Sequence, residues 1–100
     1  MAEKKMNSYE TIFIIDSTLE PDAIAAEKDK FVNLISENGE LGEVEEWGKR
    51  KLAYAINFKT EGYYVLVNFK ADVEFPKELD RQYRITDGIL RTIIIRKDEE

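Results

Sequence analysis

The chain has 100 residues, the size of a single domain, and its hydrophobic fraction of 43% is typical of a globular protein. Its 21 acidic and 15 basic residues give a net charge of -6, which argues against a general nucleic-acid binder but allows a locally basic face. The absence of cysteine and histidine excludes disulfides and cysteine zinc sites, and it removes the commonest general base and metal ligand.

Neither a signal peptide nor a membrane span is expected. Residues 1–7 are polar and charged, and no apolar run in the chain is long enough for either role. Together with the missing cysteines, these features fit a reducing, cytoplasmic setting. Residues 1–7 are expected to form a flexible end of the domain.

The first half of the chain predicts a strand, a helix and a second strand. Residues 9–15 are rich in β-branched and aromatic side chains and carry apolar groups on both parities, as a central strand does. A helix is predicted over residues 21–38, because Pro21 suits the first helical position and Gly39 is placed to cap the C-terminal end. The extended segment that follows continues as the second strand to Ile56.

The second half of the chain predicts a hairpin, a helix and a last strand. A loop at residues 57–62 leads into a strand at 63–69. A helix at 76–83 and a turn at 87–88 follow, and the last strand covers 89–95. Residues 97–100 are expected to form a flexible polar tail. Alternate residues of the third strand are expected to face the core, namely Tyr63, Val65, Val67 and Phe69.

The element order β-α-β-β-α-β predicts an α+β fold, a single ferredoxin-like βαββαβ domain over residues 1–100. Two helices would cover one face of a four-stranded antiparallel sheet, and the open face would carry Ile12, Ile14, Tyr64 and Leu66. A contiguous apolar surface of this kind marks a partner surface. RNA-binding domains of this topology display aromatic residues where the first strand here has isoleucines, so a protein partner is favoured over stacked bases.

Basic residues are concentrated in one segment of this acidic chain. Lys49, Arg50 and Lys51 are consecutive, and Arg84 and Arg91 flank the last predicted turn. Composition alone favours a solvated strand edge for the three consecutive cations. The alternative is a patch that contacts phosphates, in which each cation displaces counterions and gives the affinity a dependence on salt.

The sequence offers no group of residues suited to catalysis, a metal or a cofactor. The Asp16-Ser17-Thr18 turn has hydroxyls without a histidine partner, and it lacks the arginine on which acylphosphatases of this fold depend. Glu43, Glu45 and Glu46 lack the spacing of a hard-cation site, so a solvated strand edge is the simpler interpretation. We therefore expect no enzyme, no metal and no cofactor.

Four motifs are similar to those of a known family. They are Tyr9-Glu10, the segment from Gly48 to Ile56, Gly62-Tyr63-Tyr64, and the segment from Tyr83 to Arg91. Together they resemble the family of bacterial ribosomal protein six of the small subunit, in register from Met6 to Lys97. The segment from Gly48 to Ile56 is the most specific of the four.

The resemblance implies a ferredoxin-like structural protein in the cytoplasm, within the small ribosomal subunit. Members bind the central domain of 16S ribosomal RNA during subunit assembly, as a heterodimer with ribosomal protein eighteen. That partner is basic and would occupy the open face of this acidic chain. Arg50, Lys51, Arg84 and Arg91 match basic positions of the family motifs, and with Lys49 they are expected to approach RNA phosphates or the junction between RNA and partner.

The chain departs from the family pattern at Asn7 and Ser8, where some members carry arginines, so an N-terminal RNA contact is not expected. A second interpretation comes from a different functional class. It is a ferredoxin-like regulatory domain that binds a small ligand and dimerises through its sheet. Such a domain would need a glycine-lined pocket at the dimer interface.

Overall fold

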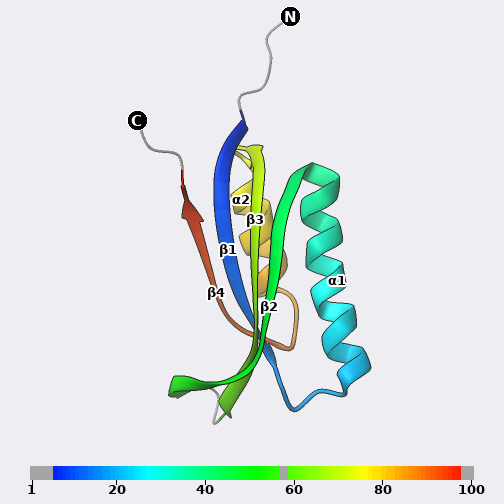
Figure 1. The fold of residues 1–100 in the computed structure, drawn as a ribbon, viewed down its shortest axis with the longest axis vertical. Coiled ribbons are helices and arrows are strands. Elements are labelled where there is room, and N and C mark those ends of the chain that lie inside the picture. The colour runs from blue at the N-terminus through cyan, green and yellow to red at the C-terminus, as the bar shows by residue number, and fades with distance from the viewer. Residues whose placement is uncertain (1–5, 57–58, 98–100) are drawn as a thin grey trace, which may run out of the picture.

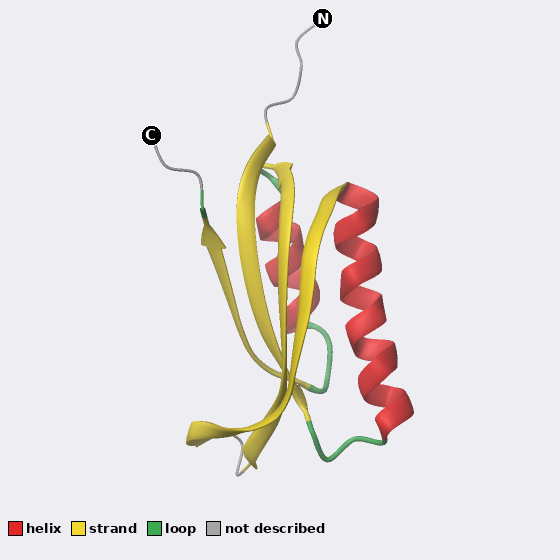
Figure 2. Ribbon diagram, in the orientation of Figure 1, coloured by secondary structure: helices red, strands yellow, loops and turns green. Residues whose placement is uncertain are grey.

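A computed structural model describes residues 6–56 and 59–97, without the side chains of Ala53 and Ile56. The elements, in the order of Figure 1, are β1 Met6–Asp16, α1 Pro21–Asn38, β2 Gly39–Ile56, β3 Lys59–Asp72, α2 Phe75–Arg84 and β4 Ile89–Arg96. The strands pair antiparallel in the spatial order β2-β3-β1-β4. Both helices lie against the same face of the sheet (Figure 2), which is the predicted ferredoxin-like arrangement.

The core lies between the helices and one face of the sheet. Phe13 of β1, Phe31 of α1 and Tyr83 of α2 pack ring against ring, with centroids 4.6 to 5.5 Å apart. Val65 and Val67 of β3 are fully buried beside them, which confirms the predicted parity of this strand. Three elements distant in the sequence thus meet in one aromatic cluster, and burial of such rings is a large favourable contribution to folding.

One buried polar contact ties α2 to the central strand. The hydroxyls of Thr11 and Tyr83 are 3.0 Å apart, and the Thr11 hydroxyl also donates to the carbonyl of Ile93 at 2.9 Å. Because a hydroxyl has one proton, Tyr83 is then the donor to Thr11. Burial raises the pKa of Tyr83, so the phenol keeps the proton that this contact requires.

Both ends of the domain differ from the sequence prediction. Met6 and Asn7, expected in a flexible end, belong to β1, and the buried Asn7 side chain donates to the Tyr9 hydroxyl. Lys97, expected in a flexible tail, donates its backbone N–H to the carbonyl of Ser8 at 2.8 Å. Polar composition alone does not reveal such long-range pairing. The rest of the two predicted ends, 1–5 and 98–100, lies outside the described residues.

The predicted loop at 57–62 is also wrong in part. β3 begins at Lys59, so residues 59–62 are strand, while 57–58 lie outside the described residues. Gly62, the last residue of the predicted loop, pairs with Asp16 on one side and Arg50 on the other. A Cβ at Gly62 would overlap the side chain of Ile14, so close packing between strands explains the glycine.

Gly39 follows α1 as predicted, yet its role as a cap is different. Its φ of -170° is extended rather than left-handed, and any residue can adopt it. A Cβ at this position would overlap the backbone oxygen of Lys70 on β3. The glycine is therefore explained by the close approach of β2 to β3 directly after the helix.

Candidate functional site

The open face of the sheet brings together the four residues predicted for a protein partner. Ile12 on β1 lies opposite Leu66 on β3 and Ile93 on β4. Ile14, the next residue of β1 on the same face, lies opposite Tyr64. Since paired residues point to the same side of a sheet, these side chains share one surface that no helix covers.

Accessibility on this face differs from the prediction. Ile14 and Leu66 are only 7% and 6% exposed, because neighbouring side chains of the same chain cover them. Ile93 and Ile95 on β4 are 45% and 48% exposed, and Trp47 on β2 is exposed as well. Ile93 and Ile95 were not predicted for the open face, although the alternation of side chains along β4 could have indicated that they share one face. Trp47 could not be placed, because the strand is irregular at that point.

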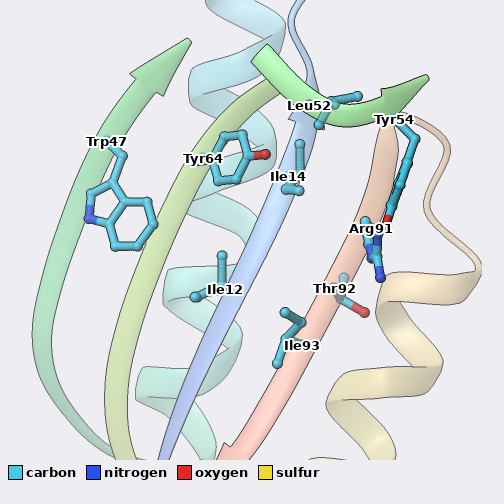
Figure 3. Close-up of a pocket in the computed structure, with 9 residues that line it drawn as sticks. All are labelled: Ile12, Ile14, Trp47, Leu52, Tyr54, Tyr64, Arg91, Thr92 and Ile93. Carbon is cyan, nitrogen blue, oxygen red and sulfur yellow. The ribbon is translucent and has the colours of Figure 1, made fainter. Parts of the chain in front are cut away.

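The end of β2 curls over one end of the open face. The pairing of β2 with β3 shifts between Glu46 and Gly48, and Gly48 has a φ of 80°, a conformation that favours glycine. Beyond this bulge β2 passes across the sheet towards β4 (Figure 3). Gly62 permits this crossing, since its missing Cβ leaves space for Ile14, with Leu52 of the curled strand close by.

A hollow of about 190 Å³ lies between the curled strand and the sheet (Figure 3). Its apolar surface is made by Ile12, Ile14 and Ile93 of the sheet and by Leu52 of the curled strand. Its sides are formed by Trp47 and Tyr64 from one edge and by Tyr54, Arg91 and Thr92 from the other. None of these lining residues is a glycine, so the hollow differs from the pocket expected of a regulatory small-ligand domain.

One side of the hollow is a stack of an arginine and two aromatic rings. The rings of Trp47 and Tyr64 lie nearly parallel, with centroids 6.2 Å apart, and the guanidinium of Arg50 lies 5.3 Å from the centroid of the Trp47 ring. The indole N–H of Trp47 donates to the Glu45 carboxylate at 3.0 Å. These contacts favour the observed orientation of the indole beside the hollow.

The three consecutive cations divide between the two sides of the hairpin. Arg50 lies opposite Gly62 and reaches the open face through its contact with Trp47. Lys49 lies opposite Tyr63, on the side of the hairpin that faces α1, and Lys51 has the same parity. All three are exposed, and within residues 6–56 and 59–97 none has an ion pair.

The two other predicted cations also lie in different places. Arg84 ends α2, where its guanidinium is 2.8 Å from the carboxylate of Asp80. Arg91 lies on β4 opposite Ile14, so it belongs to the open face, beside Tyr54 (Figure 3). Arg50 and Arg91 thus border the hollow from opposite edges, whereas Arg84 belongs to the helix layer and is already neutralised by an acid.

A polar network holds the base of the hairpin against α1. The Glu46 carboxylate accepts hydrogen bonds from Lys28 of α1 at 2.8 Å and from the Tyr63 hydroxyl at 2.6 Å. The Lys28 hydrogen bond, together with that of Tyr63, lowers the pKa of Glu46. Sequence reasoning treated Glu46 as part of a solvated edge, and its partner on the helix could not be found without the fold.

The turn after β1 is stabilised by contacts of the Asp16 carboxylate. Asp16 accepts hydrogen bonds from the Thr18 backbone N–H at 3.0 Å and from its hydroxyl at 2.7 Å, and Lys59 lies 3.3 Å away. Burial acts to raise the pKa of Asp16, but the Thr18 and Lys59 contacts outweigh it and lower the pKa.

In the described part of the chain, no group of three or more acidic, histidine or cysteine residues is placed to hold a metal, and no helix is long and apolar enough to cross a membrane.

Comparison with known proteins gives a consistent result over almost the whole chain. The model of the family "Ribosomal protein S6" matches residues 8–96. Small ribosomal subunit protein bS6 from Thermoanaerobacter pseudethanolicus is 53% identical and that from Clostridium novyi 47%, each over 94% of this chain and 100% of the relative. The crystal structure of 30S ribosomal protein S6 from Thermotoga maritima is similar with a TM-score of 0.87 and 32% identity, over 93% of this chain and 89% of that one.

Proposed function

The chain belongs to the ribosomal protein S6 family of the small subunit, and we propose that it binds the central domain of 16S ribosomal RNA as a heterodimer with ribosomal protein eighteen. The family is one of ribosomal structural proteins that act in translation, which is not an enzyme class. The proposed localisation is the cytoplasm, within the small ribosomal subunit.

The uncovered apolar face of the sheet is the observation that supports a protein partner most strongly. Ile93 and Ile95 are nearly half exposed, and Trp47 extends the same surface across β2. Exposed apolar residues gathered on one rigid face are typical of a protein interface. A basic partner suits a chain whose net charge is -6.

The cations support a contact with RNA at the hairpin end. Lys49 and Lys51 point away from the open face, so phosphates bound there would not compete with a protein on the sheet. Arg50 and Arg91 border the part of the open face that the partner would cover, and this position suits the junction between RNA and partner. Arg84 contributes less in this proposal, because RNA would have to compete with Asp80 for its guanidinium.

A binding titration tests this proposal. A fragment of the 16S central domain is titrated with the protein, with and without ribosomal protein eighteen. We expect weak binding by the protein alone and strong binding with the partner, because the partner supplies cationic surface and orders the RNA site. Tight binding without the partner would contradict the cooperative mechanism. No binding in either titration would contradict the function itself.

A further inference from the structure

We propose that the hollow beneath the end of β2 receives one large apolar side chain of the protein partner. This inference rests on the proposed heterodimer and adds the place and the chemistry of its central contact. The hollow lies where the curled strand meets the open face, so a partner that covers the sheet must cover it as well (Figure 3).

The size of the hollow fits a single side chain. Its volume is about 190 Å³, and a cavity of about 150 Å³ lined by apolar residues is enough to hold a benzene ring. A leucine, methionine or phenylalanine side chain therefore fills it. Interfaces typically place such an anchor in a pocket near their centre, where water is excluded.

The chemistry of the hollow favours an apolar side chain over a nucleobase. Ile12, Ile14, Ile93 and Leu52 have no side-chain hydrogen-bonding groups, and most strand backbone groups between them are engaged in the ladder. A base inserted among these four side chains would lose water from its polar edges, and polar side chains are found only at the sides of the hollow. Trp47, the ring best suited to stacking, already contacts Tyr64 and Arg50.

The charges around the hollow define how a basic partner would lie. Arg50 and Arg91 border it and have no ion pair within the described residues, so they repel cations next to the anchor. Two acids lie on the same face. Glu45, opposite Leu66, lies beside the hollow, where its carboxylate accepts the indole N–H of Trp47. Glu10, opposite Ile95, lies further from the curled strand. The basic groups of the partner are then drawn towards these two acids, while its apolar segment lies at the hollow.

Tryptophan fluorescence gives a direct test, because Trp47 is the sole tryptophan of the chain and lines the hollow. The protein is titrated with ribosomal protein eighteen in which any tryptophan is replaced by phenylalanine. If an apolar side chain enters the hollow, the emission of Trp47 shifts to shorter wavelength, and the acrylamide quenching constant falls by about twofold or more as the indole loses water.

A matched pair of variants locates the contact. Ile93→Phe places a larger side chain in the hollow, whereas Ile95→Phe makes the same change on the same face of β4, outside it. We expect Ile93→Phe to weaken the heterodimer about tenfold more than Ile95→Phe does. Both positions are nearly half exposed, so the thermal midpoints of the free variants should match that of the unchanged protein.

The outcomes separate this inference from the proposed function. A heterodimer that forms with no change in Trp47 emission and equal effects of the two variants overturns the inference and leaves the heterodimer standing. Failure of the two unchanged proteins to associate overturns the proposed function. A shift of Trp47 emission that the RNA fragment causes alone, and that Ile93→Phe abolishes, assigns the hollow to a nucleobase and also overturns the inference.

Discussion

Phe13 and Ile12 are neighbours on β1 and point to opposite faces of the same sheet. Phe13 is fully buried between Phe31 and Tyr83, so folding of this chain alone removes its side chain from water. Ile12 lies between Leu66 and Ile93, and Ile93 remains nearly half exposed. Both faces are apolar, but only one is covered by helices. The difference teaches that one face provides stability and the other offers a surface for recognition.

The largest expected effect compares these two neighbours directly. Phe13→Ala should lower the free energy of unfolding by about 3–5 kcal/mol, because it leaves a cavity in the aromatic cluster. Ile12→Ala should lower it by about 1 kcal/mol, because its side chain is partly exposed and no helix covers it. Urea unfolding of the two variants measures both quantities. Equal losses would show that the open face is as important for folding as the core.

The next effect concerns the two glycines that shape the hairpin. Gly62→Ala should lower the free energy of unfolding by about 1–3 kcal/mol, because the new Cβ overlaps Ile14 and displaces the curled strand. Gly48→Ala should cost about 1 kcal/mol from the backbone alone, since no atom lies within 4 Å of its Cβ position. Only Gly62→Ala should also weaken binding of the protein partner, as measured by titration. Equal partner affinity in both variants would show that the crossing over Ile14 does not matter for recognition.

A smaller effect is expected at the base of the hairpin, as a function of pH. The pKa of Glu46 is lowered from its usual value of 4.5 in the folded state, chiefly by the Lys28 hydrogen bond. Its contribution to stability is thus present above about pH 4.5 and is lost as the pH falls through the lower folded-state pKa. The pair is partly exposed, so we expect about 1 kcal/mol or less.

Glu46→Gln tests this pH dependence in urea melts between pH 7 and pH 3, with Glu43→Gln as the control on the same strand. The Glu46 variant should lose stability at neutral pH and converge with the unchanged protein in acid. A constant difference across the pH range would show that the carboxylate charge is irrelevant to the contact.

The smallest effect on stability is expected from the cations of the hairpin. Arg50→Ala combined with Lys51→Ala should change the free energy of unfolding by about 0.5 kcal/mol or less, because both side chains are exposed. The same double variant should reduce the slope of log affinity against log salt by about 1 for each phosphate that the protein no longer neutralises. Filter binding of the heterodimer to the RNA fragment measures the slope.

Lys77→Ala is the matched control for this experiment, since Lys77 is an exposed lysine of α2. It should leave the salt slope unchanged. A marked loss of thermal stability in the double variant would instead assign Arg50 and Lys51 a structural role. An unchanged salt slope would move the RNA contact away from the hairpin.

Local patterns in the sequence were sufficient for most of the architecture. The helix at residues 21–38 was predicted with its observed bounds, because a proline at the first helical position and a glycine directly after the last one are local signals. The parity of β3 followed from simple alternation. The order of the elements then permitted few topologies, and the observed sheet is the predicted one.

Tertiary structure decided what the site looks like. The sequence grouped Lys49 and Arg50 as one patch, yet strand alternation sends them to different sides of the hairpin. The bulge at Gly48 directs Trp47 to the open face, and the crossing at Gly62 places β2 over Ile14 to form the hollow. Helix and strand periods depend on near neighbours, and the sequence by itself determines them. A bulge and a close crossing depend on atoms of other strands, so only the folded chain reveals them.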